Sequence, residues 1–237
     1  MKYPKNLEYV KASQDASDKL DMSTEATDEE LNEAITDEFG VKYSKDGRKL
    51  LKAPQELDRT YSIRKGTKIV CDMAFAYCKS LSNVVIPDSV TSIGGGAFNE
   101  CDSLRSVVIS DGVTSIGDNA FQFCSALNDI IISDSVTSIG IYAFGECSSL
   151  SSLVIPDSVT SIGDWAFYYC DALRSVVIPD GVTSIGVGAF IGCKSLKSLE
   201  IPDSVTSIGF GAFSYCYFPY KLKKELISRF GDKIFGN

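Results

Sequence analysis

The stretch "IPDSVTSIGDWAFYYC", Ile155–Cys170, occurs twice more in the chain with few changes. It returns as "IPDGVTSIGVGAFIGC" from Ile178 to Cys193 and as "IPDSVTSIGFGAFSYC" from Ile201 to Cys216. Self-similarity at a constant spacing is typical of repeat architectures, in which each unit packs only on its neighbours. The stretch therefore predicts a solenoid.

Three residue types keep the same period through most of the chain. A phenylalanine recurs every 23 residues, a cysteine follows three positions later, and an isoleucine ends each expected strand. The phenylalanines are Phe75, Phe98, Phe121, Phe144, Phe167, Phe190 and Phe213. The cysteines are Cys78, Cys101, Cys124, Cys147, Cys170, Cys193 and Cys216, and the isoleucines are Ile63, Ile86, Ile109, Ile132, Ile155, Ile178 and Ile201.

Each repeat unit has the pattern of a leucine-rich repeat. Leu104, Val107 and Ile109 follow the L-x-x-L-x-L spacing of its strand, and "DNAF" favours a short helical turn that buries Phe121. One coil cannot bury these apolar side chains alone, so neighbouring coils must stack. We expect an α/β repeat solenoid, a curved right-handed superhelix with parallel β-strands, short helical turns and about seven coils over residues 58–218.

The segments outside the repeat are expected to form a tail and two caps. Residues 1–26 are polar and acidic, which favours a disordered tail. An N-terminal cap is expected over 27–57, with a capping box from Thr27 to Glu30 and a hairpin turning at Asp46-Gly47. Its helix would place four apolar residues on one face: Leu31, Ala34, Ile35 and Phe39.

A capping helix is expected over residues 219–237. Pro219 suits its first turn. Four apolar side chains are expected to face inward: Leu222, Leu226, Ile227 and Phe230.

Composition excludes several classes of function. The net charge of −8 argues against nucleic acid as a partner, because phosphate binding needs clustered Lys and Arg. The chain has no histidine, which removes the commonest general base and a common zinc ligand. No apolar run approaches the roughly 18 residues of a membrane span, so membrane insertion is not expected. We expect no catalytic residues, no metal and no cofactor.

The order "IPDSVTSIG", "AF" and "C", repeated in consecutive coils, resembles the BspA-like leucine-rich repeat family of bacterial surface and secreted proteins. The resemblance covers about Tyr61 to Cys216, and "DEFGVKYSKDGRKLLKAP" is similar to the lead-in of such proteins. It implies an extracellular or cell-surface protein, although the start lacks a signal peptide, so the chain would be cytoplasmic if Met1 is the native start.

The same resemblance implies a non-enzymatic binding or adhesion module that engages a protein partner. A host extracellular-matrix protein and another bacterial surface protein are the expected partners. A purely structural spacer or assembly scaffold, and a carbohydrate-binding surface, are the alternatives.

Two places vary between coils and are the candidate binding sites. Outward positions of the strands, expected on the concave face, are Arg105, Val108, Asp129, Ile131, Val154, Arg174 and Val177. Aromatic residues flank "AF" at Phe123, Tyr142, Trp165, Tyr168 and Tyr169. Ordinary β-propensity could explain the aliphatic strand positions, and packing under the neighbouring coil could explain the aromatic ones.

Two further columns of residues have plainer interpretations. The repeated cysteines are expected to be buried thiols that donate to turn carbonyls; a Cys71–Cys78 disulfide stays open. The repeated aspartates are expected to cap turns by accepting a backbone N–H two residues on, in preference to binding calcium. They are Asp88, Asp111, Asp134, Asp157, Asp180 and Asp203.

Overall fold

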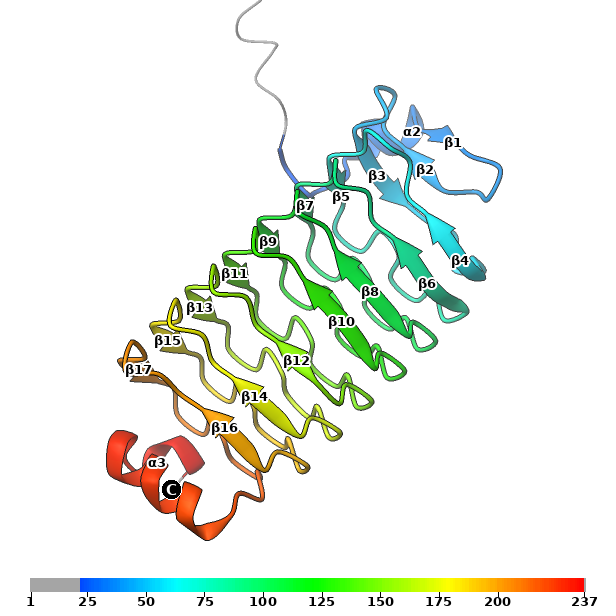
Figure 1. Cartoon of the computed structure of the whole chain (residues 1–237). Helices are drawn as coiled ribbons and strands as arrows, with labels where there is room; N and C mark the ends of the chain where they lie inside the picture. The colour runs from blue at the N-terminus through cyan, green and yellow to red at the C-terminus, as the bar shows by residue number, and fades with distance from the viewer. Residues whose placement is uncertain (1–21, 237) are drawn as a thin grey trace, which may run out of the picture.

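The computed structural model describes residues 22–236, which form a solenoid of stacked coils closed by a cap at each end (Figure 1). Each coil contributes one strand of two to five residues to one side (the long strands), one strand of two residues to a second side (the short strands), and a turn segment that carries the repeated phenylalanine. The strands of successive coils pair in parallel and in register, 23 residues apart. The predicted leucine-rich repeat solenoid is therefore confirmed.

The short strands form one continuous sheet of ten strands, which also includes the N-terminal hairpin. Its order is β1 (Ile35–Thr36), β2 (Lys42–Tyr43), β3 (Lys49–Lys52), β5 (Ile69–Val70), β7 (Ser92–Ile93), β9 (Ser115–Ile116), β11 (Ser138–Ile139), β13 (Ser161–Ile162), β15 (Ser184–Ile185) and β17 (Ser207–Ile208).

The long strands form the other side of the coils, in two adjoining sheets. The first contains β4 (Arg59–Ser62), β6 (Leu81–Val85), β8 (Ser106–Ile109) and β10 (Asp129–Ile132). The second contains β12 (Leu153–Val154), β14 (Ser175–Val177) and β16 (Ser198–Glu200). We call the outer surface of these two sheets the strand face.

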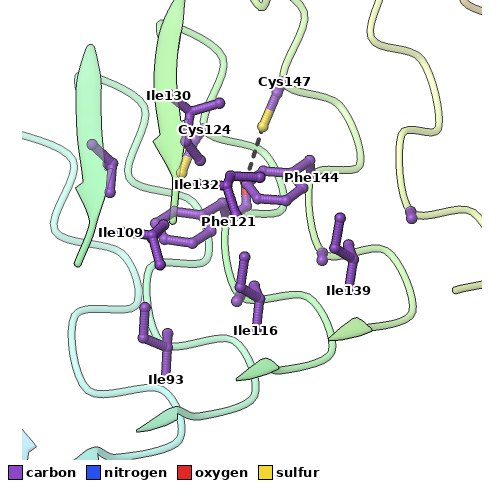
Figure 2. Close-up of a cluster of buried hydrophobic side chains, with 14 of the residues drawn as sticks. Ile93, Ile109, Ile116, Phe121, Cys124, Ile130, Ile132, Ile139, Phe144 and Cys147 are labelled. Atoms are coloured by element: carbon purple, nitrogen blue, oxygen red, sulfur yellow. Dashed lines mark hydrogen bonds between the residues drawn. The ribbon is translucent and has the colours of Figure 1, made fainter. Parts of the chain in front are cut away.

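The core is a stack of similar layers, one from each coil. In β8, Val107 and Ile109 are buried while Val108 between them is exposed, as the two-residue period of a strand requires. The repeated phenylalanine rings lie one above another through the whole solenoid, and Figure 2 shows Phe121 and Phe144 in this arrangement. Consecutive ring centroids are 4.9, 5.1, 5.4, 5.5, 5.1 and 5.7 Å apart, with interplanar angles of 13° or less.

The repeated cysteines form a hydrogen-bonded column beside these rings. From Cys101 to Cys216, each Sγ donates to the backbone carbonyl of the phenylalanine 26 residues earlier, as Cys124 does to Phe98 at 3.1 Å. The expectation of buried thiols that donate to turn carbonyls is confirmed. Cys78, in the first coil, is a free thiol that donates to the Pro54 carbonyl, so it forms no disulfide with Cys71.

The N-terminal cap matches the prediction in its helix start and hairpin but not in its apolar face. Helix α2 (Asp28–Asn32) begins with the predicted capping box of Thr27 and Glu30. The helix ends after five residues, so Ile35 lies in strand β1 and is 46% exposed, and Phe39 in the following turn is 58% exposed. The prediction of a single helical face is therefore wrong, because the chain turns into the sheet at that point.

The hairpin joins the predicted first coil directly. Strands β2 and β3 pair antiparallel around the turn at Asp46-Gly47, and β3 then pairs in parallel with β5. Of the expected tail, residues 1–21 lie outside the described residues. Thr24 was expected to be disordered, but its carbonyl accepts a hydrogen bond from the Asp72 N–H at 2.8 Å.

The C-terminal cap supplies the partners that a further coil would have supplied. Helix α3 (Tyr220–Phe230) is followed by the 3₁₀ helix η1 (Asp232–Phe235). The Ile234 carbonyl accepts the Phe213 N–H at 2.8 Å, as the Ala212 carbonyl does for Phe190 in the preceding coil. Leu226 is buried, whereas Ile227 is 37% exposed, so the inward position predicted for Ile227 is wrong. Within residues 22–236 no helix is long and apolar enough to cross a membrane.

Candidate partner-binding surfaces

The strand face carries a row of exposed aliphatic side chains, one from each of five consecutive coils. We call this row the strand-face stripe. Its members and their exposed fractions are Val85 (53%), Val108 (54%), Ile131 (56%), Val154 (79%) and Val177 (56%). Val108 and Ile131 are register partners in neighbouring strands, and so are Val154 and Val177. The stripe is therefore continuous along the solenoid axis within each of the two sheets.

The stripe ends where the terminal coils carry polar residues at the same position. Ser62 of β4 pairs in register with Val85, and Glu200 of β16 pairs with Val177. Both residues are exposed. The fold thus accepts a hydroxyl or a carboxylate at this position, and β-strand geometry alone does not demand the aliphatic residues between them.

Charged residues lie on both sides of the stripe. Arg105, Asp129 and Arg174 come at the starts of the long strands and are exposed, as expected. At the other side, all six repeated aspartates are exposed. The turns that follow the strands are closed by main-chain bonds, as when the Val90 N–H donates to the Pro87 carbonyl at 3.0 Å. No described aspartate of this column accepts the backbone N–H two residues on, so the predicted side-chain capping is wrong.

A shallow groove lies between the stripe and the aspartate column in the N-terminal half of the solenoid. Its volume is about 340 Å³. The apolar side is formed by Val85, Val108 and Ile131, and the acidic rim by Asp88 and Asp111. Ser110 and Ser133 also line it, at the coil position where Pro87 and the later coils have proline.

The aromatic candidates form a second surface, in the turn segments before the long strands. Tyr142 stacks on Trp165 with ring centroids 5.0 Å apart and an interplanar angle of 10°. Tyr168 meets Tyr142 edge-on at 5.9 Å and Tyr169 at 4.4 Å. These four residues, which we call the aromatic cluster, are half-buried. Phe123, two coils earlier than Tyr169, is exposed and contacts no other aromatic ring among residues 22–236, so it lies outside the cluster.

Glycines of the next coil make room for two rings of the aromatic cluster. Trp165 and Tyr169 adopt positive φ of 52° and 51°, where the next coil has Gly188 and Gly192. A Cβ at Gly188 would lie 2.5 Å from Cδ1 of Trp165, and one at Gly192 would lie 3.0 Å from the Tyr169 ring. The rings therefore pack on the neighbouring coil, which is the plainer of the two interpretations. Part of each ring face is covered in this way.

Sequence reasoning missed the groove and two exposed aromatic residues after the last coil, Tyr217 and Tyr220. The exchange of proline for serine at Ser110 and Ser133 was the available signal for the groove. Tyr215, Tyr217 and Tyr220 are 68%, 61% and 82% exposed. Tyr215 occupies the coil position of Tyr169 but has no following coil to cover it, and this exposure depends on where the solenoid stops.

The surroundings of the repeated cysteines disfavour their use as nucleophiles. Residues 22–236 contain no group of three or more His, Cys, Asp or Glu side chains that could hold a metal ion. Burial raises the pKa of the Cys78 thiol to about 12 and that of the Cys147 thiol well above its usual value. A thiolate nucleophile is therefore strongly disfavoured in the column.

Parallel coils with short turns and an exposed strand face define a leucine-rich repeat protein, a class whose fold is typically non-enzymatic. The family model of the BspA type leucine rich repeat region matches residues 59–174 and 160–237. The chain therefore belongs to the BspA-type leucine-rich repeat family. This family indicates a protein-interaction or scaffold module, and its members are typically surface or secreted proteins.

Solved structures of bacterial leucine-rich repeat proteins are similar to the chain. A leucine-rich repeat protein of T. pallidum has 31% identity and a TM-score of 0.73, over 86% of this chain and 95% of that one. A leucine rich cell surface protein of Faecalibacterium prausnitzii A2-165 has 39% identity and a TM-score of 0.69, over 78% of this chain and 52% of that one. The chain thus spans about half the length of the latter. No curated protein sequence matches the chain.

Proposed function

We propose that this protein is an adhesion module, displayed at a bacterial surface or secreted, that binds a protein partner through the strand-face stripe. The similarity to a cell surface protein of Faecalibacterium prausnitzii supports this location. Binding by apolar contact with charged residues at the rim is the usual anatomy of a protein interface.

The observation that carries the proposal is the stripe itself. Five consecutive coils keep a β-branched aliphatic side chain more than half exposed, while Ser62 and Glu200 show that polar residues are accepted there. An exposed contiguous apolar surface lowers solubility and marks interaction sites in soluble proteins. A purely structural spacer does not require an exposed aliphatic stripe.

The aromatic cluster supports a carbohydrate ligand less well. Stacking on a sugar needs an open ring face, but Tyr142 and Trp165 stack on each other and Tyr169 packs on Gly192. Three of its four rings can be removed by substitutions that another coil of the chain already carries. Trp165→Gly, Tyr168→Ile and Tyr169→Gly convert this turn to the residues of Gly188, Ile191 and Gly192 in the next coil.

The test is label-free binding to immobilised extracellular-matrix proteins and purified bacterial surface proteins. The stripe variant carries Val108→Thr, Ile131→Thr and Val154→Thr, which keep β-branched side chains on the strands. We expect saturable binding of the natural protein to at least one panel member, and loss of that binding in the stripe variant at unchanged melting temperature. No saturable binding to any member would favour the scaffold alternative.

A further inference from the structure

We propose that the groove beside Val85, Val108 and Ile131 takes an arginine or lysine side chain of the protein partner. This inference rests on the proposed function, because it assigns a specificity pocket to the same face. The occupant would lay its aliphatic stem on the stripe and direct its charged head at Asp88 and Asp111.

The groove has two walls of different chemistry. Val85, Val108 and Ile131 form an aliphatic wall that is more than half exposed to solvent. Asp88 and Asp111, from successive coils, form the opposite rim and are exposed. Lysine and arginine are the side chains that join an apolar stem to a cationic head, and they cover apolar surface while the head stays at the polar side.

The floor of the groove is polar and already hydrogen-bonded. The Ser133 hydroxyl donates to Oδ1 of Asp111 at 2.6 Å, and the Ser110 hydroxyl donates to the Pro87 carbonyl at 3.2 Å. The bond from Ser133 holds the Asp111 carboxylate at the rim. Later coils have proline in place of these serines, so this pair of hydroxyls distinguishes the groove from the rest of the strand face.

Charge favours a cation at this place. Within residues 22–236 neither Asp88 nor Asp111 makes an ion pair with a side chain of its own chain. Residues 62–134, which span the groove and the coils on either side of it, carry eight Asp and Glu against five Lys and Arg, with Lys65 at the coil position of Asp88 in the preceding coil. The carboxylates of the rim would repel an anionic partner side chain, and a neutral side chain would form no ion pair with them. A second copy of this chain would present the same acidic surface.

The protein itself places a guanidinium against this column. Arg229 of α3 donates to the Ile201 carbonyl at 2.8 Å and to Oδ1 of Asp203 at 3.4 Å. Asp203 is the last member of the column that contains Asp88 and Asp111. An arginine head therefore fits beside an aspartate at this coil position.

The experiment titrates the isotope-labelled full chain with the capped tripeptide acetyl-Leu-Arg-Leu-amide and follows backbone amide shifts by NMR. The matched peptide has citrulline, a neutral analogue of similar shape, in place of arginine. The groove variant is Asp88→Asn with Asp111→Asn. The control variant is Asp157→Asn with Asp180→Asn, which removes two carboxylates of the same column outside the groove.

We expect saturable shifts at residues 84–88, 107–111 and 131–133, and about fivefold weaker binding for the citrulline peptide. The groove variant should weaken arginine binding to a similar degree, and the control variant should leave it unchanged. Equal affinity for the two peptides, an unchanged affinity in the groove variant, or no saturable shift would overturn the inference. If the tripeptide fails while the stripe variant still abolishes partner binding, only the groove assignment is wrong.

Discussion

The thiol of Cys147 donates a hydrogen bond to the backbone carbonyl of Phe121, with Sγ and O 3.2 Å apart (Figure 2). The same pair recurs in every coil from Cys101 to Cys216, always 26 residues apart. Because the donor and acceptor belong to adjacent coils, the bond ties the turn segments together directly beside the stacked phenylalanine rings. The cysteine and phenylalanine columns therefore act as one structural unit.

Removing one central thiol should measurably destabilise the solenoid. Cys147→Ala deletes a buried sulfur and its bond to Phe121, so we expect the free energy of unfolding in urea to fall by about 1–2 kcal/mol. Cys216→Ala is the matched control at a partly exposed position, and its cost should be smaller. Equal costs at the two positions would contradict a contribution from burial.

Stability should fall at alkaline pH because the buried thiols resist ionisation. Burial raises the pKa of Cys78 to about 12, and burial also raises the pKa of Cys124, Cys147 and Cys193. The folded state thus holds these protons above pH 9, where unfolded thiols lose them. Their contribution to stability is complete below the pKa of the unfolded thiol and declines as pH rises towards the folded values.

Urea unfolding between pH 7 and pH 11, under reducing conditions, measures this decline. Replacing Cys124 and Cys147 by alanine should make the slope of stability against pH shallower. A slope that is the same in the natural protein and the variant would rule out a role for these two thiols.

The stacked rings should be most sensitive to truncation in the middle of the solenoid. Phe144→Ala removes a fully buried ring that lies 5.4 Å from Phe121 and 5.5 Å from Phe167, so we expect a loss of about 3–5 kcal/mol. Chemical denaturation gives the value. Phe144→Leu should cost less, since it keeps part of the volume, and a loss below 1 kcal/mol for the alanine variant would show that the coils can collapse onto the cavity.

Arg229 should stabilise the packing of helix α3 on the last coil of the solenoid. Its guanidinium donates to the carbonyls of Ile201 and Pro202, which no further coil covers. In Arg229→Met we expect amide hydrogen exchange to speed up in β16 and α3 while β8 stays protected. Lys224→Met, on the same helix and exposed, is the control. Faster exchange in both variants would point to a general effect of charge.

The positions of residues inside the repeat could be predicted from the sequence, whereas those in the two caps were predicted less well. Phe121 and Cys124 were placed in the core because their period is fixed, and period-two burial placed Val108 and Ile131 outward. The expected place of Ile35 was wrong because it depends on where helix α2 ends. The expected place of Ile227 was wrong because its exposure depends on how helix α3 is rotated against the last coil. The half-buried state of Trp165 depends on Gly188 in the next coil, a contact that becomes visible only when the coils are stacked.

The most direct test of the central claim is a comparison of two triple variants against one panel partner. One is the stripe variant of Val108, Ile131 and Val154, and the other is the variant of Trp165, Tyr168 and Tyr169. Dissociation constants would be measured for both, alongside the natural protein, after melting has shown each to be folded. Binding through the strand-face stripe predicts a loss of at least about tenfold in affinity for the stripe variant, and no loss for the aromatic one. Affinity retained by the stripe variant and lost by the aromatic variant would contradict it.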